Sequence, residues 1–341
     1  MIINISFVDF WSGFDYSIMT FYHILKKHFD VVIHDDVQEA DYVFFSCFGD
    51  KHWNVPPTKI KIFITAENIR PDFNTCDYAI AFDRLSFGDR YLRFPNIYGP
   101  ICKRDVLEKV AKKHLPPYPE KTSFCSFVVS NSEAESIRVQ LFKQLSRYRI
   151  VDSGGRYLNN IDGPVEDKFS FDQKHKFSIC CENSAHAGYI TEKLYEAFSA
   201  QLIPIYWGAP DVGLTFNKKA FIDVSDYDSI DEAIAYIKRV DQDAELYNAI
   251  LAEPALVNEA EENFEYYYKQ LESFLLSIFN QSLFDARRYN RTSADFFYPN
   301  KVAKLMKMAQ SPFIRLLNKV NALPNYLSST FNKKVRRKDL S

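Results

Sequence analysis

The chain has 341 residues, of which 47% are apolar, with a formal net charge of −2 and only 10 glycines. This length and apolar content suit two globular domains, and the scarcity of glycine excludes collagen-like and linker-rich proteins. The near-neutral charge argues against a chain-wide surface for nucleic acid, so no nucleic-acid partner is expected.

The first third of the chain alternates strand patterns with one helical pattern. Strands are expected at Ile2–Val8, DVVIHDD (30–36), ADYVFFSCFGD (40–50), KIKIFITAEN (59–68) and DYAIAFD (77–83), and a helix over Tyr16–Phe29. Short apolar strands between polar turns are typical of a parallel sheet buried on both faces. Residues 103–122 are charged and proline-rich, which indicates a crossing between two domains.

A second alternation begins at residue 123. Strand patterns occur at SFCSFVVSN (123–131), RIVDSGG (149–155), KFSICCEN (176–183), LIPIYWG (202–208) and AFIDVSD (220–226), and helical patterns over Glu133–Tyr148, Thr191–Ala200 and Ile230–Val240. Two β/α units in tandem predict an α/β fold with two Rossmann-like domains facing across a cleft. We place these domains at residues 1–120 and 121–290.

The last segment, 291–341, is predicted to be a helical, basic tail. Apolar residues between Phe313 and Leu323 share one helical face, and the cluster NKKVRRK (332–338) follows. An amphipathic helix beside a basic cluster can lie on an anionic membrane surface. The alternative is a helix packed on the body, followed by a solvated end, and the sequence leaves both readings open.

Cysteine usage and hydropathy bear on location. The six cysteines show no CxxC spacing and no accompanying histidine cluster, so we expect free thiols, a reducing compartment and no metal site. The N-terminal stretch MIINISFVDFWSGF reads as a strand, and no run of 18 uncharged apolar residues occurs. The sequence predicts a cytoplasmic protein, peripheral on the inner membrane if the tail is an anchor.

The loop between KFSICCEN and the helix at Thr191 concentrates polar groups at the carboxyl end of a predicted parallel strand. Ligands bind at this edge of open α/β sheets, and a helix N-terminus attracts anions. Lys193 suits a phosphate, Tyr189 can donate to it, and Asn183 can both donate to and accept from sugar hydroxyls. Glu192 can accept from hydroxyls. Together these groups indicate a nucleotide sugar, although Glu192 and Lys193 alone would fit a solvated helix start.

The stretch FSICCENSAHAGYITEKLYEAFSAQLIPIYWGAP (177–210) resembles the donor-binding signature of glycosyltransferase family 10, the α-1,3/1,4-fucosyltransferases. One departure is Cys181, which stands where phenylalanine is usual. FITAENIRPDFNTCDYAIAFDRLSFGDRYLRFP (63–95) resembles the family's acceptor-side segment, whose proposed base falls on Glu67. VVSNSEAESIRVQLFKQL (128–145) matches the segment with a donor-phosphate arginine, which falls on Arg138.

The resemblance implies a GT-B fold in which residues 1–120 bind the acceptor and residues 121–290 bind GDP-fucose. It implies inverting transfer of L-fucose from GDP-β-L-fucose to an N-acetylglucosamine-type hydroxyl, with a Lewis X-like product in bacterial lipopolysaccharide or capsule. Alternatives are α-1,4 transfer, another GT-B nucleotide-sugar transferase, and a non-enzymatic glycan-binding module.

The resemblance also assigns roles to residues, with protein cations in place of a metal and no cofactor. Glu67 is expected to be the base, and Glu192 to offset positive charge or hold fucose. The donor-binding set is Arg138, Asn183, Tyr189, Glu192 and Lys193. His186, in the variable loop, is expected to be incidental, and His175 to lie at the surface.

Overall fold

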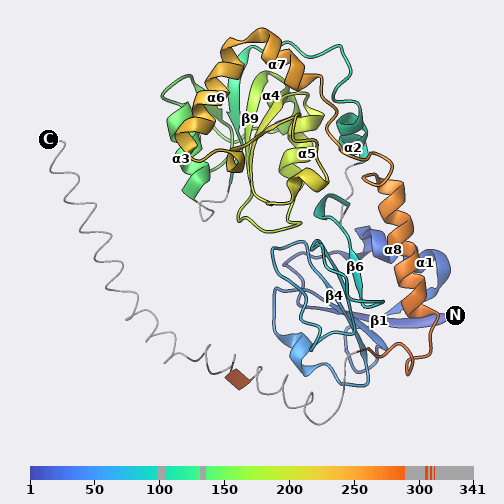
Figure 1. Ribbon diagram of the computed structural model, residues 1–341. Helices are drawn as coiled ribbons and strands as arrows, with labels where there is room; N and C mark the ends of the chain where they lie inside the picture. The colour runs from blue at the N-terminus through green and yellow to red at the C-terminus, as the bar shows by residue number, and fades with distance from the viewer. Residues whose placement is uncertain (99–103, 131–135, 289–303, 306–307, 309–310, 312–341) are drawn as a thin grey trace.

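The computed structural model describes residues 1–98, 104–130, 136–288, 304–305, 308 and 311. Two parallel β-sheets, each with its own helices, form two bodies that follow one another along most of the chain (Figure 1). The α/β prediction is therefore confirmed. The predicted amphipathic helix and basic cluster of the tail lie outside the described residues.

The first sheet is parallel throughout, with strand order β2-β1-β3-β4-β5-β6. Its strands are β1 Ile2–Val8, β2 Asp30–Ile33, β3 Tyr42–Phe45, β4 Ile60–Ile64, β5 Tyr78–Ala81 and β6 Tyr91–Arg93. The central strands β3 to β5 are almost continuously buried, as their unbroken apolar runs require. The predicted helix over 16–29 is a 3-10 turn, Tyr16–Ile18, followed by α1, Thr20–His28. Strand β6 was not predicted.

Helix α8, Phe264–Phe279, returns from the second body and packs on the first sheet (Figure 1). The ring of Phe279 lies 4.2 Å from that of Tyr42 in β3, and Lys27 of α1 pairs with Glu272 at 2.7 Å. The helix falls inside the range predicted for the second domain, yet it completes the core of the first. The predicted division of the chain therefore differs here from the spatial grouping.

The second sheet is also parallel, with strand order β11-β10-β9-β7-β8. Its strands are β7 Ser123–Phe127, β8 Val151–Ser153, β9 His175–Cys181, β10 Ile203–Trp207 and β11 Ile222–Asp223. The associated helices are α3 Ser136–Leu145, α4 Lys168–Gln173, α5 Glu192–Ser199, α6 Ile230–Gln242 and α7 Ala244–Leu251. The sequence predicted these five strands and three of the helices, but not α4 or α7.

The predicted crossing at 103–122 contains a further helix, α2 (Arg104–Ala111), which packs against α5. After it, the fully buried Lys113 donates from Nζ to the carbonyl oxygens of Ile250 and Glu253. The segment between the two domains is thus hydrogen-bonded to the C-terminal end of α7 and the residues that follow it. Within the described ranges, no helix has the length and apolar character needed to cross a membrane.

Candidate functional site

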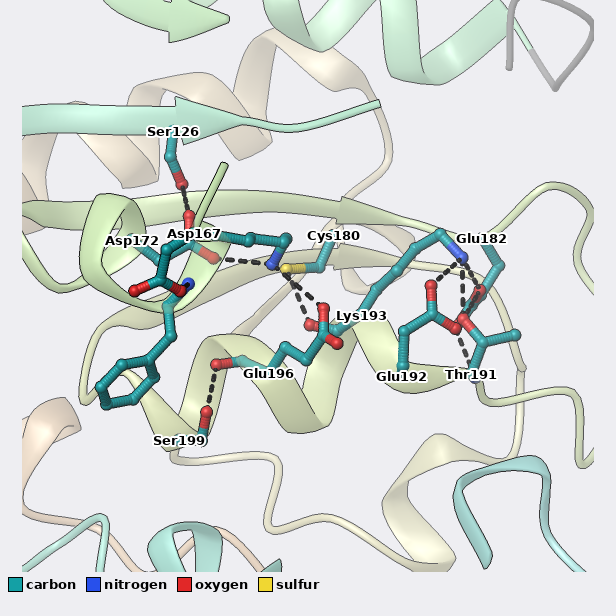
Figure 2. Close-up of polar contacts among 12 residues, drawn as sticks. Ser126, Asp167, Asp172, Cys180, Glu182, Thr191, Glu192, Lys193, Glu196 and Ser199 are labelled. Atoms are coloured by element: carbon teal, nitrogen blue, oxygen red, sulfur yellow. Dashed lines mark hydrogen bonds and ion pairs between the residues drawn. The ribbon is translucent and has the colours of Figure 1, made fainter. Parts of the chain in front are cut away.

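The N-terminus of α5 is organised by Glu182, the residue directly after β9. Its side chain is fully buried and accepts from the Thr191 N–H at 2.8 Å and from the Thr191 hydroxyl at 2.7 Å. Thr191 has the extended backbone of an N-cap residue, but its own side chain caps no N–H group of α5. The carboxylate of Glu182 therefore fixes where the helix begins (Figure 2).

Lys193 lies in the first turn of α5, where the helix dipole disfavours a positive charge. Its Nζ is 2.8 Å from the Thr191 hydroxyl, 3.2 Å from Glu182 Oε2 and 3.4 Å from Glu192 Oε1 (Figure 2). Burial lowers the pKa of Lys193, but the carboxylates of Glu182 and Glu192 outweigh burial and raise it. Lys193 therefore keeps its proton and its positive charge beside a helix N-terminus.

The two carboxylates next to Lys193 differ in their surroundings. Burial raises the pKa of Glu182 above its usual range, while Lys193 opposes this shift. Burial also acts to raise the pKa of Glu192, but Lys193 and nearby hydrogen-bond donors bring it below its usual range. Glu192 is 48% exposed, so it is an ionised group that a ligand can reach.

Arg138 lies near the start of α3, the helix that follows β7, and β7 is the neighbour of β9 in the sheet. The residue is 2% exposed, and the charge of Glu182 acts on its guanidinium group. Burial lowers its pKa from a very high ordinary value, so the group stays charged. The structure thus brings together the predicted cations Arg138 and Lys193 around a buried carboxylate that the sequence did not assign.

Tyr189 connects this cluster with the first domain. Its ring packs edge-on against Phe82, which follows β5, with centroids 5.1 Å apart. Burial raises the pKa of Tyr189 to about 12, with further contributions from the carboxylates of Glu182, Glu67 and Glu192. The Tyr189 hydroxyl therefore lies in the electrostatic field of predicted site residues from both domains.

Asn183 follows Glu182 in the loop after β9. It is partly exposed, and its side chain makes no hydrogen bond to any residue that the structure describes. An amide that is both partly exposed and without a partner can meet ligand hydroxyls as donor and acceptor. The donor-binding role of Asn183 stays a prediction.

Glu67 is exposed in the loop after β4, and its backbone is held from both sides. Its N–H donates to the Thr65 hydroxyl at 3.0 Å, and the Asn96 amide donates to the Ala66 carbonyl at 2.8 Å. Asn68 donates to the Ser184 hydroxyl at 2.5 Å, across the junction between the two domains. The predicted base is therefore at the same junction as the predicted donor loop.

Two more contacts join the loops after β5 and β9. Asp83, in the loop after β5, contacts His186 Nε2 of the loop after β9 at 3.2 Å, and within the first domain it accepts from Arg70 Nε at 2.8 Å. Gly188 has φ of +78°, and a Cβ there would lie 2.8 Å from the Phe82 carbonyl oxygen, so this approach requires glycine. His186, predicted to be incidental, thus contributes to the junction.

Asp211 makes two further hydrogen bonds at this junction, since it accepts from Arg84 Nε and from the Gly188 N–H, both at 2.7 Å.

The prediction for His175 is wrong. It is 2% exposed and bonds the Phe171 carbonyl oxygen and Asp152, because its strand begins inside the second domain. Cys181 is buried in the core of the second domain.

Sequence reasoning missed the organising role of Glu182. The available signal was an acidic residue immediately after an uninterrupted buried strand, a position at which burial requires partners. In the part of the chain that the structure describes, no group of three or more His, Cys, Asp or Glu side chains is arranged to hold a metal ion.

The chain matches two family models. Residues 5–98 match the α-(1,3)-fucosyltransferase FucT N-terminal domain, and residues 118–252 match glycosyltransferase family 10 (fucosyltransferase) C-term. The chain is 34% identical over 267 residues to the α-(1,3)-fucosyltransferase FucT of Helicobacter pylori, covering 69% of this chain and 56% of that protein. It therefore spans little more than half the length of this curated relative.

Solved structures are similar over a larger share of the chain. A crystal structure of an α1,3-fucosyltransferase superposes with a TM-score of 0.72 at 28% identity, covering 83% of this chain and 92% of the other. A structure of an α1,3-fucosyltransferase with GDP-fucose gives a TM-score of 0.66 at 29% identity, covering 80% and 90%. The predicted GT-B architecture of two Rossmann-like domains is confirmed.

Proposed function

Because the chain belongs to glycosyltransferase family 10, the fucosyltransferases, we propose that it transfers L-fucose from GDP-β-L-fucose to a glycan hydroxyl. The observation that carries this proposal is the arrangement at the α5 N-terminus. There an ammonium ion, a buried guanidinium group, an amide with no hydrogen-bond partner among the described residues, and an exposed carboxylate surround a turn that lies beside Glu67.

The diphosphate of the donor is the group that this turn suits best. Lys193 and Arg138 supply positive charge, and the N-terminus of α5, where the Thr191 side chain caps no N–H group, supplies N–H groups for an anion. When the diphosphate binds, Lys193 exchanges part of its contact with Glu182 and Glu192 for phosphate oxygens. Asn183 and Tyr189 complete the pocket, and Glu192 accepts from fucose hydroxyls or offsets developing positive charge at the anomeric carbon.

Glu67 is the proposed general base. Inverting single displacement requires a base on the acceptor face, opposite the leaving group, as in inverting glycosidases. Glu67 comes from the first domain and the cations come from the second, and in our proposal the two groups approach the anomeric carbon from different sides. The acceptor oxygen bonds to that carbon as the bond to the diphosphate breaks, and its proton passes to the Glu67 carboxylate.

The finer assignment is α-1,3 transfer to an N-acetylglucosamine-type acceptor, with a Lewis X-like product in bacterial surface polysaccharide. Transfer to O4 and the use of another nucleotide sugar are the alternative reactions. A non-catalytic glycan-binding module fits less well, because Glu67, Arg138 and Lys193 are all present.

We place the reaction at the cytoplasmic face of the inner membrane, with residues 312–338 as the proposed anchor. Its basic cluster should add about 1 kcal/mol of membrane affinity for each charge near an anionic surface. Full-length protein should sediment with anionic liposomes at low salt, and deletion of residues 325–341 should abolish this. Failure of the full-length chain to bind would remove the anchor.

Donor binding provides the first test of function. GDP should raise the melting temperature of the chain well above any effect of UDP or CMP. The guanine ring selects the nucleotide, and the diphosphate supplies most of the contacts. Equal shifts from the three nucleotides would contradict GDP-fucose as the donor. Transfer from GDP-fucose to a panel of oligosaccharides would then identify the acceptor.

A further inference from the structure

An arginine of the first domain reaches the proposed donor loop, residues 183–190, through one carboxylate of the second domain. The N–H of Gly188 in this loop donates to Asp211 Oδ1 at 2.7 Å. Arg84, which lies after β5, donates from Nε to Asp211 Oδ2, also at 2.7 Å. The side chains of Arg84 and Asp211 are 27% and 17% exposed, so water screens this ion pair only in part. None of the roles assigned above uses Arg84.

Asp211 occupies a position at which an aspartate usually has a local task. It is the N-cap residue of the 3-10 turn Val212–Leu214, and aspartate side chains at such positions commonly accept from the first N–H groups of the helical turn. Here the side chain makes no capping bond, and its two oxygens contact groups outside the turn. The carboxylate therefore bridges Gly188 and Arg84 and does not begin the turn.

The guanidinium group of Arg84 is itself fixed at two points. Its Nη2 donates to the hydroxyl of Thr215 at 2.8 Å, and Thr215 is fully buried at the other end of the same 3-10 turn. The Thr215 hydroxyl lies 3.4 Å from Glu262 Oε1, and Glu262 Oε2 accepts from the Tyr267 hydroxyl of α8 at 3.1 Å. A planar fork that is already held by one partner loses little freedom when it binds a second. Arg84 is thus a preorganised donor for Asp211.

The donor loop also packs directly on the residues before Arg84. The Tyr189 ring lies edge-on to the Phe82 ring, and the absence of a Cβ at Gly188 lets the loop approach the Phe82 carbonyl oxygen. The loop therefore contacts the first domain directly at Phe82, and through Asp211 it contacts Arg84. Because Tyr189 is the next residue after Gly188, the bond to Asp211 also fixes where Tyr189 of the proposed donor pocket lies.

We propose that Arg84 is a positioning residue for the donor, which holds residues 183–190 through Asp211 in the geometry that binds GDP-fucose. The inference rests on the proposed function. Removal of Arg84 leaves the cations of the second domain and the base Glu67 in place, but it frees the loop. It should therefore weaken binding of the donor and spare the chemical step.

The other interdomain bond of this loop is assigned a different effect. Ser184 accepts from Asn68, the residue next to the proposed base, so loss of that bond should act on turnover. Gly188 and Tyr189 lie further along the loop, where the donor is expected to bind. The two contacts should thus be distinguishable by whether kcat or the KM for GDP-fucose changes.

The test is steady-state kinetics with GDP-fucose as the varied substrate and the acceptor that the unmodified chain uses best. Arg84→Ala should raise the KM for GDP-fucose by about 5- to 20-fold, between the effects of an exposed ion pair and of a charge-assisted hydrogen bond. Titration calorimetry should show a similar loss of affinity for GDP. The value of kcat should stay within about threefold of the unmodified level, which also reports that the variant is folded. Arg84→Lys should have an intermediate KM, because one ammonium group does not reproduce the fork between Asp211 and Thr215.

Asp211→Ala separates an indirect role of Arg84 from a direct one. This variant should raise the KM for GDP-fucose at least as much as Arg84→Ala, since it also frees the Gly188 N–H. In the Asp211→Ala background, Arg84→Ala should add less than about twofold. The matched control is Arg149→Ala, which removes a partly exposed arginine contact with Asp241, 2.8 Å long and inside the second domain. It should leave the KM for GDP-fucose unchanged.

Three results would overturn the inference. They are an unchanged KM for GDP-fucose in Arg84→Ala, a loss confined to kcat, and a full further rise in KM in the Asp211→Ala background, which would mean that Arg84 contacts the donor itself. Arg84→Lys, which keeps the charge, carries the same test if the alanine variant does not fold. Absence of both fucose transfer and GDP binding in the unmodified chain would instead overturn the proposed function, so the two failures are distinguishable.

Discussion

The side-chain amide of Asn68 donates a hydrogen bond of 2.5 Å to the hydroxyl of Ser184. Asn68 follows the proposed base Glu67, and Ser184 follows Asn183 of the proposed donor loop, so this bond joins the two halves of the site. The contacts of Asp83 with Arg70 and His186 lie at the same junction. The position of the base relative to the donor therefore depends on a few hydrogen bonds between loops.

Asn68→Ala should lower kcat by about 3- to 10-fold, because one hydrogen bond typically contributes about 0.5–1.5 kcal/mol. Binding of GDP should change little, since neither Asn68 nor Ser184 is assigned to the donor. Ser184→Ala should have a similar effect, and the double variant should be no worse than either single variant. Additive losses in this cycle would show that the contact does not act as a unit.

Glu67→Gln keeps the size and shape of the side chain but removes its basicity. We expect kcat to fall by about 10²-fold or more, while the GDP-induced shift in melting temperature is retained. Glu120→Gln, at another exposed position, is the matched control and should behave as the unmodified chain. Turnover near the unmodified level in Glu67→Gln would remove this residue from the mechanism.

Lys193→Ala should weaken GDP binding and also destabilise the fold by about 1–3 kcal/mol, because fully buried Glu182 loses an ionic partner. Adding Glu182→Gln removes the buried charge and should restore much of the stability, but not the affinity for GDP. Calorimetric titration and urea unfolding of the same proteins separate the two effects. Recovery of GDP binding in the double variant would contradict a direct role for Lys193.

Arg138→Ala should also weaken GDP binding and turnover together, since Arg138 is assigned to the same leaving group. Titration calorimetry with GDP gives the affinity, and initial rates at saturating acceptor give the turnover. Loss of turnover with unchanged GDP affinity would place this arginine outside the diphosphate site.

The buried Lys113 predicts a pH dependence of stability. Burial lowers its pKa to about 7, against the opposing charge of Glu253, whereas the unfolded chain keeps a lysine pKa near 10.4. Between about pH 7 and pH 10 the unfolded state therefore binds more protons, so the free energy of unfolding should rise with pH.

The comparison with Lys113→Met isolates this contribution. One proton corresponds to at most about 1.4 kcal/mol per pH unit, and the variant should lack this part of the slope in urea unfolding between pH 7 and pH 9. Identical slopes in both proteins would show that Lys113 stays protonated in the folded state.

Much of the fold could be predicted because its signal is local. Uninterrupted apolar runs such as 42–45 and 203–207 are typical of buried parallel strands, and both are strands in the structure. Helix α4 is only six residues long, too short for a helical period to be recognised, and strand β6 consists of Tyr91, Leu92 and Arg93, which form no apolar run. The return of α8 to the first sheet depends on contacts such as Phe279 with Tyr42, which lie far apart in the sequence.

The candidate site shows the same division between local and long-range information. Glu192, Lys193, Asn183 and Tyr189 lie within eleven residues, so their grouping follows from one loop and one helix start. The contacts of Glu182 with Thr191 and of Asn68 with Ser184 require the folded chain, because they depend on burial and on the approach of two domains. The contact of Arg84 with Asp211 likewise arises only where the two domains meet.

The most direct measurement is the structure of the product formed from GDP-β-L-fucose and N-acetyllactosamine, determined by nuclear magnetic resonance. We expect a single fucose in α-anomeric configuration on O3 of the N-acetylglucosamine residue, formed by the unmodified chain and at least about 10²-fold more slowly by Glu67→Gln. A β-linked product, or equal rates for the two proteins, would contradict inverting transfer with Glu67 as the base.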